Sequence, residues 1–156
     1  MAIDCFLMVD GIEGESTDDQ HKGAINVLSF SWGEQAAAGT GHGGGRVSMQ
    51  DLRFTETTNK ASPKLLLACA SDQRIKTAVL SCRKPGQKDD FLTITLSEVL
   101  ISSFEISGSQ SSDPGPTEEI SLNFTKIEWE YRPQAPGGKL GSPVTAGWDL
   151  ETGRPV

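Results

Sequence analysis

The stretch that decides the fold is residues 28–54, which read Leu-Ser-Phe-Ser-Trp-Gly-Glu-Gln-Ala-Ala-Ala-Gly-Thr-Gly-His-Gly-Gly-Gly-Arg-Val-Ser-Met-Gln-Asp-Leu-Arg-Phe. Both ends alternate apolar and polar residues as strands do, and five glycines lie in the loop between them. A β-hairpin needs a loop of only about two to five residues, whereas a connection of about a dozen is typical of a segment that binds something or becomes ordered against another surface. The stretch therefore predicts two strands joined by a functional loop.

The segment before this loop is the clearest half-buried strand of the chain. Within residues 24–32, one face carries the bulky apolar side chains Leu28, Phe30 and Trp32. The alternate positions Ser29 and Ser31 form a polar face. We expect the three apolar side chains in the core and the two serines on the outside.

The segment after the loop changes the parity of its alternation. Val47 and Met49 share one parity, and Leu52 and Phe54 continue with the other. A β-bulge near residues 50–51 accounts for such a shift. The same shift separates residues 120–124 from residues 127–131, which predicts a second bulged and strongly bent strand.

The remaining segments complete a mainly β chain. Further strands are expected over residues 3–9, 78–83, 91–101 with an extension to 106, 120–124, 127–131 and 144–150. Residues 62–71 predict one short helix, with Ser62 as its N-cap and Pro63 in its first turn. About eight strands and one helix predict a single domain over residues 1–156. Its fold is expected to be an antiparallel β-barrel of two packed sheets with a flanking helix and a long glycine-rich inter-strand loop.

Composition and charge disfavour several classes of partner. The chain has 156 residues with 14 basic and 21 acidic side chains, a formal net charge of −7, which repels nucleic acid and anionic membranes. The N-terminus has no basic region and carries an acid at position 4, so it is not expected to be a signal peptide. No apolar run reaches membrane-spanning length, so no membrane insertion is expected. Cys5, Cys69 and Cys82 have apolar neighbours and are expected to be reduced core residues.

Motifs of catalysis occur only in incomplete form. Residues 39–44 match Gly-x-Gly-x-x-Gly, but a strand rather than a helix is expected to follow them. Residues 42–45 resemble the oxyanion strip of lipases, but the chain has no Gly-x-Ser-x-Gly nucleophile motif. His21 is expected on a surface loop, and Glu118 and Glu119 at a solvated strand start. The sequence therefore predicts a protein that is not an enzyme and has no metal or cofactor.

Several segments, in order along the whole chain, resemble one protein family. They are residues 25–33 (INVLSFSWG), 47–55 (VSMQDLRFT), 62–70 (SPKLLLACA), 92–103 (LTITLSEVLISS), 118–124 (EEISLNF), 131–134 (YRPQ) and 147–149 (GWD). Together they resemble the haemolysin-coregulated protein (Hcp) family. This resemblance implies a small β-barrel with a flanking helix.

The resemblance also implies a function. Hcp proteins are tube subunits of the type VI secretion system of Gram-negative bacteria. Their hexameric rings stack into a hollow tube inside a contractile sheath, which a spike protein of the VgrG type caps and which can carry effector proteins in its lumen. The subunit is made in the cytoplasm and leaves the cell through this machinery without a signal peptide.

Two groups of residues are candidates for roles in such a tube. Ser29 and Ser31 are expected to face the lumen and the cargo. The loop is expected to stack one ring on the next through Glu34, Gln35, Gly39, Thr40, Gly41, His42, Gly43, Gly44 and Gly45. The alternatives are a disordered surface loop and, for the whole chain, a monomeric β-barrel that binds a small apolar ligand.

Overall fold

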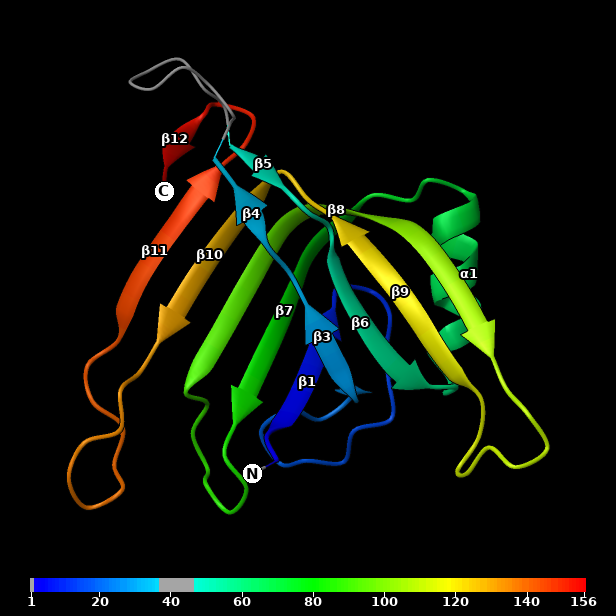
Figure 1. Cartoon of the computed structure of the whole chain (residues 1–156), viewed down its shortest axis with the longest axis horizontal. Coiled ribbons are helices and arrows are strands. Elements are labelled where there is room, and N and C mark those ends of the chain that lie inside the picture. The colour runs from blue at the N-terminus through cyan, green and yellow to red at the C-terminus, as the bar shows by residue number, and fades with distance from the viewer. Residues whose placement is uncertain (1, 37–46) are drawn as a thin grey trace.

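The computed structural model describes residues 2–36 and 47–156 and confirms a mainly β fold (Figure 1). The strands are β1 (Asp4–Val9), β2 (Ile25–Val27), β3 (Ser29–Ser31), β4 (Glu34–Gln35), β5 (Ser48–Met49), β6 (Leu52–Thr57), β7 (Ile75–Arg83), β8 (Leu92–Ser107), β9 (Thr117–Asn123), β10 (Lys126–Tyr131), β11 (Val144–Asp149) and β12 (Arg154–Pro155). The helix α1 (Ser62–Ala70) flanks the strands.

Two antiparallel layers share the long strand β8. The larger layer has the order β12-β11-β10-β8-β7-β1-β2, and the smaller layer pairs β3 with β6, β6 with β9, and β9 with the second half of β8. The chain from β2 to β3 also passes from the larger layer to the smaller one. The layers are thus joined at two corners, as the prediction of two packed sheets requires.

The core fills the space between the smaller layer and one half of the larger layer. Leu7 of β1, Leu80 of β7 and Ile94 of β8 face Phe54 of β6 and Ile120 of β9, and each is at most 1% exposed. Full burial of one such side chain contributes about 1.5–3 kcal/mol. This packing holds the two layers together. Cys5 and Cys82 belong to the same core as free thiols, as predicted, and Cys69 is half-buried.

The predicted strand over residues 24–32 is divided at Leu28. Its N–H donates to the carbonyl of Thr55 (2.8 Å), and its side chain is 62% exposed, so the expectation that Leu28 lies in the core is wrong. The chain turns from β2 into β3 at this residue, which carries the side chain outward. Phe30 and Trp32 are half-buried and pack against the core.

The two predicted bulges are strand ends. β5 ends at Met49 and β6 begins at Leu52, while β9 ends at Asn123 and β10 begins at Lys126. In each case the chain leaves one group of paired strands and joins another, which changes the parity of the buried side. The irregularity of register lies instead in β8, between Ile101 and Ser103.

The helix lies where the sequence predicts it but begins differently. Ala61 is its N-cap residue and makes no side-chain hydrogen bond there, so the assignment of Ser62 as N-cap is wrong. The Asn59 side chain accepts a hydrogen bond from the Ala61 N–H (2.8 Å). Leu65 and Ala68 anchor the inner side of the helix and are fully buried.

Candidate assembly surface

One face of the larger layer is apolar from strand to strand. Directly opposed residues of antiparallel strands place their side chains on the same face. Trp129 of β10 pairs with Ile94 of β8 on one side and with Ala146 of β11 on the other. One step along, Tyr131 pairs with Val144. The apolar face of the core therefore continues onto β10 and β11.

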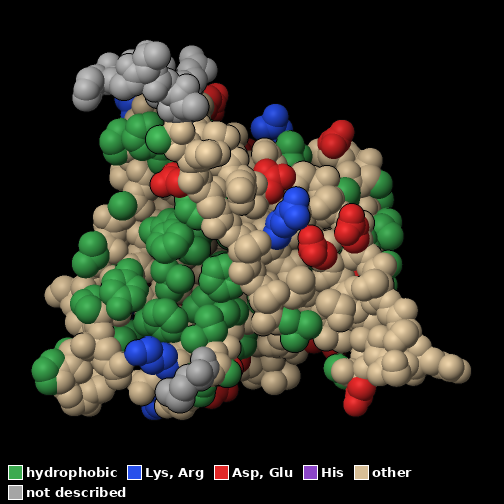
Figure 2. Space-filling model, in the orientation of Figure 1, with side chains coloured by type: hydrophobic (Ala, Val, Ile, Leu, Met, Phe, Trp, Pro, Cys, Tyr) green, Lys and Arg blue, Asp and Glu red, His purple; other side chains and the backbone are tan. Residues whose placement is uncertain are grey.

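The smaller layer covers only part of this apolar face. Ile94 is 1% exposed, whereas Trp129 is 38%, Tyr131 47% and Val144 65% exposed. Figure 1 shows β3, β6 and β9 in front of only one side of the larger layer, and Figure 2 shows apolar side chains gathered on the other side. Contiguous exposed apolar surface of this kind marks sites where proteins or ligands bind.

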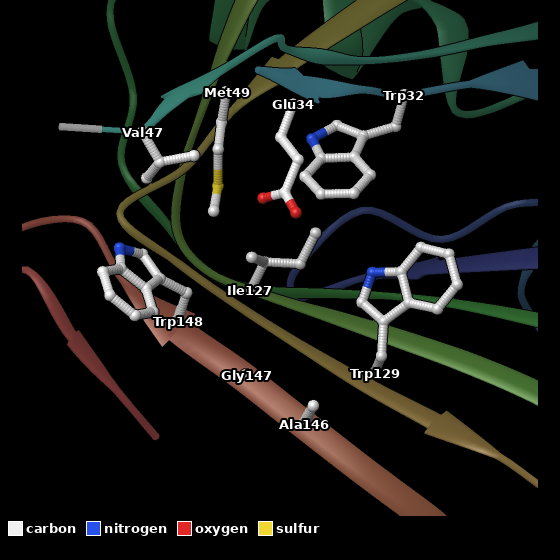
Figure 3. Close-up of a pocket in the computed structure, with 9 residues that line it drawn as sticks. All are labelled: Trp32, Glu34, Val47, Met49, Ile127, Trp129, Ala146, Gly147 and Trp148. Atoms are coloured by element: carbon white, nitrogen blue, oxygen red, sulfur yellow. The ribbon is translucent and has the colours of Figure 1, made fainter. Parts of the chain in front are cut away.

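A groove, here called the tryptophan groove, lies between this face and the ribbon of β4 and β5. It encloses about 590 Å³ and is lined by Trp32, Glu34, Val47, Met49, Ile127, Trp129, Ala146, Gly147 and Trp148. Figure 3 shows the ribbon side chains on one wall and the side chains of β10 and β11 on the other. Residues far apart in the sequence thus form a single apolar site.

Two polar groups interrupt the apolar lining. The Trp32 indole N–H is buried and has no hydrogen-bond acceptor among residues 2–36 and 47–156. The Glu34 carboxylate points between the two walls (Figure 3). The rings of Trp32 and Trp129 lie 6.0 Å apart at 49°, within the usual range of aromatic pairs. The groove is therefore suited to an apolar group with a nearby positive charge.

The outer side of β3 is polar. Ser29 and Ser31 are exposed, as predicted, and the hydroxyl oxygens of Ser29 and Thr55 are hydrogen-bonded at 2.6 Å. Beside them Arg53 and Glu119 form an exposed ion pair (3.7 Å). These side chains border a shallow hollow next to β6. This surface is hydrophilic, in contrast to the groove.

Two carboxyl groups are buried where β6, β9 and α1 meet. Glu56 is fully buried and Glu118 is 1% exposed, so the assignment of Glu118 to a solvated strand start is wrong. The hydroxyls of Ser62 and Thr58 donate to the Glu118 carboxylate at 2.8 and 2.9 Å. Burial, and then the hydrogen bond with Glu118, raise the pKa of Glu56 to about 8. At neutral pH the Glu56 carboxyl is therefore expected to be mostly protonated.

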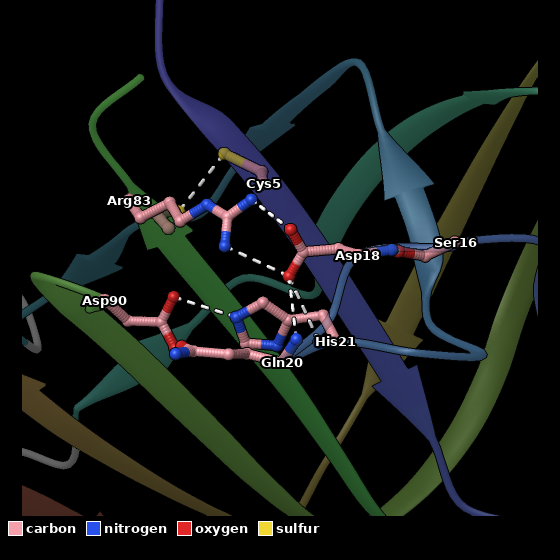
Figure 4. A network of polar contacts seen from close by, with 8 residues as sticks. Cys5, Ser16, Asp18, Gln20, His21, Arg83 and Asp90 are labelled. Atoms are coloured by element: carbon pink, nitrogen blue, oxygen red, sulfur yellow. Dashed lines mark hydrogen bonds and ion pairs between the residues drawn. The ribbon is translucent and has the colours of Figure 1, made fainter. Parts of the chain in front are cut away.

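A polar cluster fastens the segment between β1 and β2 to the larger layer (Figure 4). Arg83 donates to both carboxylate oxygens of Asp18, one of them at 3.0 Å, and this hydrogen bonding holds the pKa of Asp18 below its ordinary value. His21 is bonded to Asp90 (2.9 Å) and stacks on Phe6 with ring centroids 4.6 Å apart. His21 is thus a part-buried structural residue, and its assignment to a surface loop is incomplete.

The described residues give no arrangement typical of a metal centre or a membrane span. Among residues 2–36 and 47–156, no group of three or more histidine, cysteine, aspartate or glutamate side chains could hold a metal ion. In the same part of the chain, no helix is long and apolar enough to cross a membrane.

Comparison with known proteins assigns the family. Residues 6–131 match the family model described as "Type VI secretion system effector, Hcp". The chain belongs to the Hcp family. Protein hcp1 of Pseudomonas aeruginosa is 41% identical over 157 aligned residues, which cover 96% of each chain. The predicted resemblance is confirmed.

Solved structures of Hcp proteins share the fold. Hcp1 from Salmonella typhimurium superposes with a TM-score of 0.87 at 35% identity and covers 100% of both chains. A structure described as a type six secretion system protein gives a TM-score of 0.91 at 34% identity, covering 99% of this chain and 100% of that one. Two antiparallel layers with one flanking helix are therefore the Hcp fold.

Within this Hcp fold, the predicted stacking residues are only partly described. Glu34 and Gln35 form β4 and pair with Met49 and Ser48 of β5. The positions Gly39, Thr40, Gly41, His42, Gly43, Gly44 and Gly45 lie outside the described residues. Glu34 lines the tryptophan groove, which connects it to a site that the sequence did not indicate.

The sequence carried signals for the residues that were missed. Glu56 has the parity of Leu52 and Phe54, and Glu118 has the parity of Ile120, so alternation alone places both carboxyls on the buried side. The sequence carried a weaker indication of the groove. The alternation of Trp129 with Glu128 shows that the two side chains lie on opposite faces of β10, but not whether another layer covers the face with Trp129.

Proposed function

We propose that this Hcp-family chain is a subunit of the inner tube of the type VI secretion system. Its rings of six copies stack into a hollow tube that is propelled out of the cell with effector proteins in its lumen. The observation that carries the proposal is the tryptophan groove and the uncovered apolar face around Trp129 and Val144. A second copy that covers this face removes it from water, which is the main favourable term in most protein association.

The polar surface supports the assignment of the lumen. Ser29 and Ser31 present hydroxyls on the side of β3 that faces away from the core, with the Arg53–Glu119 ion pair beside them. Small hydroxyl and paired charged groups give a wall that holds cargo weakly and lets it pass. In the proposed tube, these residues face the effector.

The ribbon of β4 and β5 supports the stacking role. Gln35 pairs with Ser48 at the end of the ribbon, and the predicted stacking loop lies between these two residues in the sequence. Ordering a segment against another ring costs about 1–2 kcal/mol per residue, so stacking of isolated rings is expected to be weak. A spike protein of the VgrG type and the sheath proteins are the proposed partners of the stacked rings. The proposed route is synthesis in the bacterial cytoplasm and export by the type VI machinery without a signal peptide.

Sedimentation velocity and negative-stain microscopy of the purified protein test the proposal. The expected result is a discrete species of six chains and ring-shaped particles. Trp129→Glu places a charge in the groove and is expected to reduce this species to monomers with unchanged circular dichroism. A wild-type chain that sediments as a monomer at micromolar to millimolar concentration, with no rings, overturns the proposal.

The groove also favours a second candidate, a monomeric barrel that binds a small apolar ligand. A cavity of about 590 Å³ lies within the usual range of about 300–1,000 Å³ for ligand sites. This candidate predicts a monomer whose tryptophan fluorescence changes when an apolar dye binds. The sedimentation experiment separates the two, because six-chain rings and monomers differ sixfold in mass.

A further inference from the structure

The helix α1 has an outer face that is unusual for a helix in contact with water. Leu66 is 54% exposed and Leu67 60% exposed, while Leu65 and Ala68 are buried against the layers. Lys64 is the only charged residue of the helix. Exposed apolar side chains that adjoin one another mark surfaces that bind another molecule. The outer face of α1 is therefore a candidate for contact with a partner.

The helix and the tryptophan groove lie at opposite ends of the molecule. Figure 1 shows α1 on the right of the molecule and β10 and β11 on the left. A closed ring is built from heterologous contacts, in which one patch of each subunit meets a different patch of its neighbour. Two apolar patches on opposite sides of one subunit have the geometry that such a ring requires.

The charges of the two patches are complementary. Lys64 precedes Leu67 by one helical turn and is exposed on the same outer face. Glu34 points into the groove (Figure 3). Among residues 2–36 and 47–156, neither of these side chains forms an ion pair. A lysine next to two leucines thus matches a carboxylate next to three tryptophans.

We infer that the outer face of α1, with Leu66, Leu67 and Lys64, docks into the tryptophan groove of a second copy of this chain. The leucines lie against Trp129 and Trp148 of the neighbour, and Lys64 pairs with Glu34 of the neighbour. The inference rests on the proposed function, because the repetition of this head-to-tail contact is what closes the ring. It assigns both sides of the subunit junction.

The first test places a charge on the helix. Leu67→Glu is expected to convert rings into folded monomers, whereas Met8→Glu, at a position on β1 that is 42% exposed, is expected to leave the rings intact. Sedimentation velocity measures both, and thermal unfolding checks that the monomers are folded. Rings that survive in Leu67→Glu contradict the inference while the proposed function stands. If the wild-type chain itself forms no rings, the proposed function fails first.

The second test shows that the two patches meet each other. Leu67→Glu keeps an intact groove and Trp129→Glu keeps an intact helix, so an equimolar mixture restores one junction and is expected to give dimers with one copy of each variant.

Reversal of the charges gives an independent readout. Lys64→Glu and Glu34→Lys are each expected to weaken ring formation about tenfold, and the double variant is expected to recover it. If the mixture stays monomeric and the double variant shows no recovery, the inference is wrong.

Discussion

The two halves of the larger layer carry the same kind of apolar face but end in different environments. Around Ile94, the smaller layer covers the face and the side chain is 1% exposed; around Trp129, on the neighbouring strand, nothing among the described residues covers it and the side chain is 38% exposed. The closed half stabilises the subunit, and the open half is available for a neighbour. In the proposed tube, the same chemical pattern thus serves folding in one half and assembly in the other.

The largest effect is expected from the smaller layer, which covers the closed half. Phe54→Ala removes a side chain that is 1% exposed and leaves a cavity between the layers. The free energy of unfolding is expected to fall by about 3–5 kcal/mol. Urea unfolding followed by circular dichroism measures this loss, and Tyr131→Ala in the open half is the matched control. Equal losses in both variants would show that the two halves do not differ in role.

The next effect is the pH dependence of the free energy of unfolding, which arises from Glu56 of the smaller layer. The pKa of Glu56 is about 8 in the folded chain against an ordinary value of 4.5, so between these values the folded chain binds more protons than the unfolded one. The stabilisation is complete below about pH 4.5 and is lost as the pH rises through about 8. The slope within this window is at most about 1.4 kcal/mol per pH unit.

Glu56→Gln tests whether Glu56 causes this pH dependence, because the glutamine amide stays neutral and still donates a hydrogen bond. Urea unfolding between pH 5 and pH 8.5 is expected to give a flatter profile for this variant than for the wild type. Glu130→Gln, in the open half, is the control and is expected to keep the wild-type slope. A Glu56→Gln profile as steep as the wild-type one would contradict the raised pKa of Glu56.

A smaller effect on folding, but a large one on assembly, is expected in the open half. Trp129→Ala is expected to change the free energy of unfolding by about 1 kcal/mol or less, because the side chain is already partly exposed in the subunit. Buried interface tryptophans typically contribute about 2 kcal/mol or more to binding. Ring formation is therefore expected to shift to concentrations about thirtyfold higher, as measured by sedimentation. A loss of subunit stability as large as that of Phe54→Ala would remove the distinction between the halves.

The smallest effect is expected on the polar side of β3. Ser31→Gln is expected to change the stability by no more than about 0.5 kcal/mol and to leave the rings intact, because the serine is exposed. Its longer side chain narrows the proposed lumen, so retention of co-expressed effector protein on purified rings is expected to decrease. Unchanged retention would count against the assignment of Ser31 to the lumen.

The sequence predicts much of this fold because alternation is a local property. It indicates the strands, the helix over residues 62–71 and the exposed positions Ser29 and Ser31, and the resemblance indicates the family. It does not predict the exposure of Leu28, because that depends on where the chain passes from one layer to the other.

The candidate site depends on contacts between residues that are far apart in the sequence. Ribbon residues such as Met49 and strand residues such as Trp148 meet only when β10 and β11 extend past the smaller layer. The sequence by itself determined which side of its strand each residue faces, since a strand turns its side chains alternately to either side. Only the tertiary structure decided which of those sides is covered, because the reach of the second layer is set by contacts between distant segments.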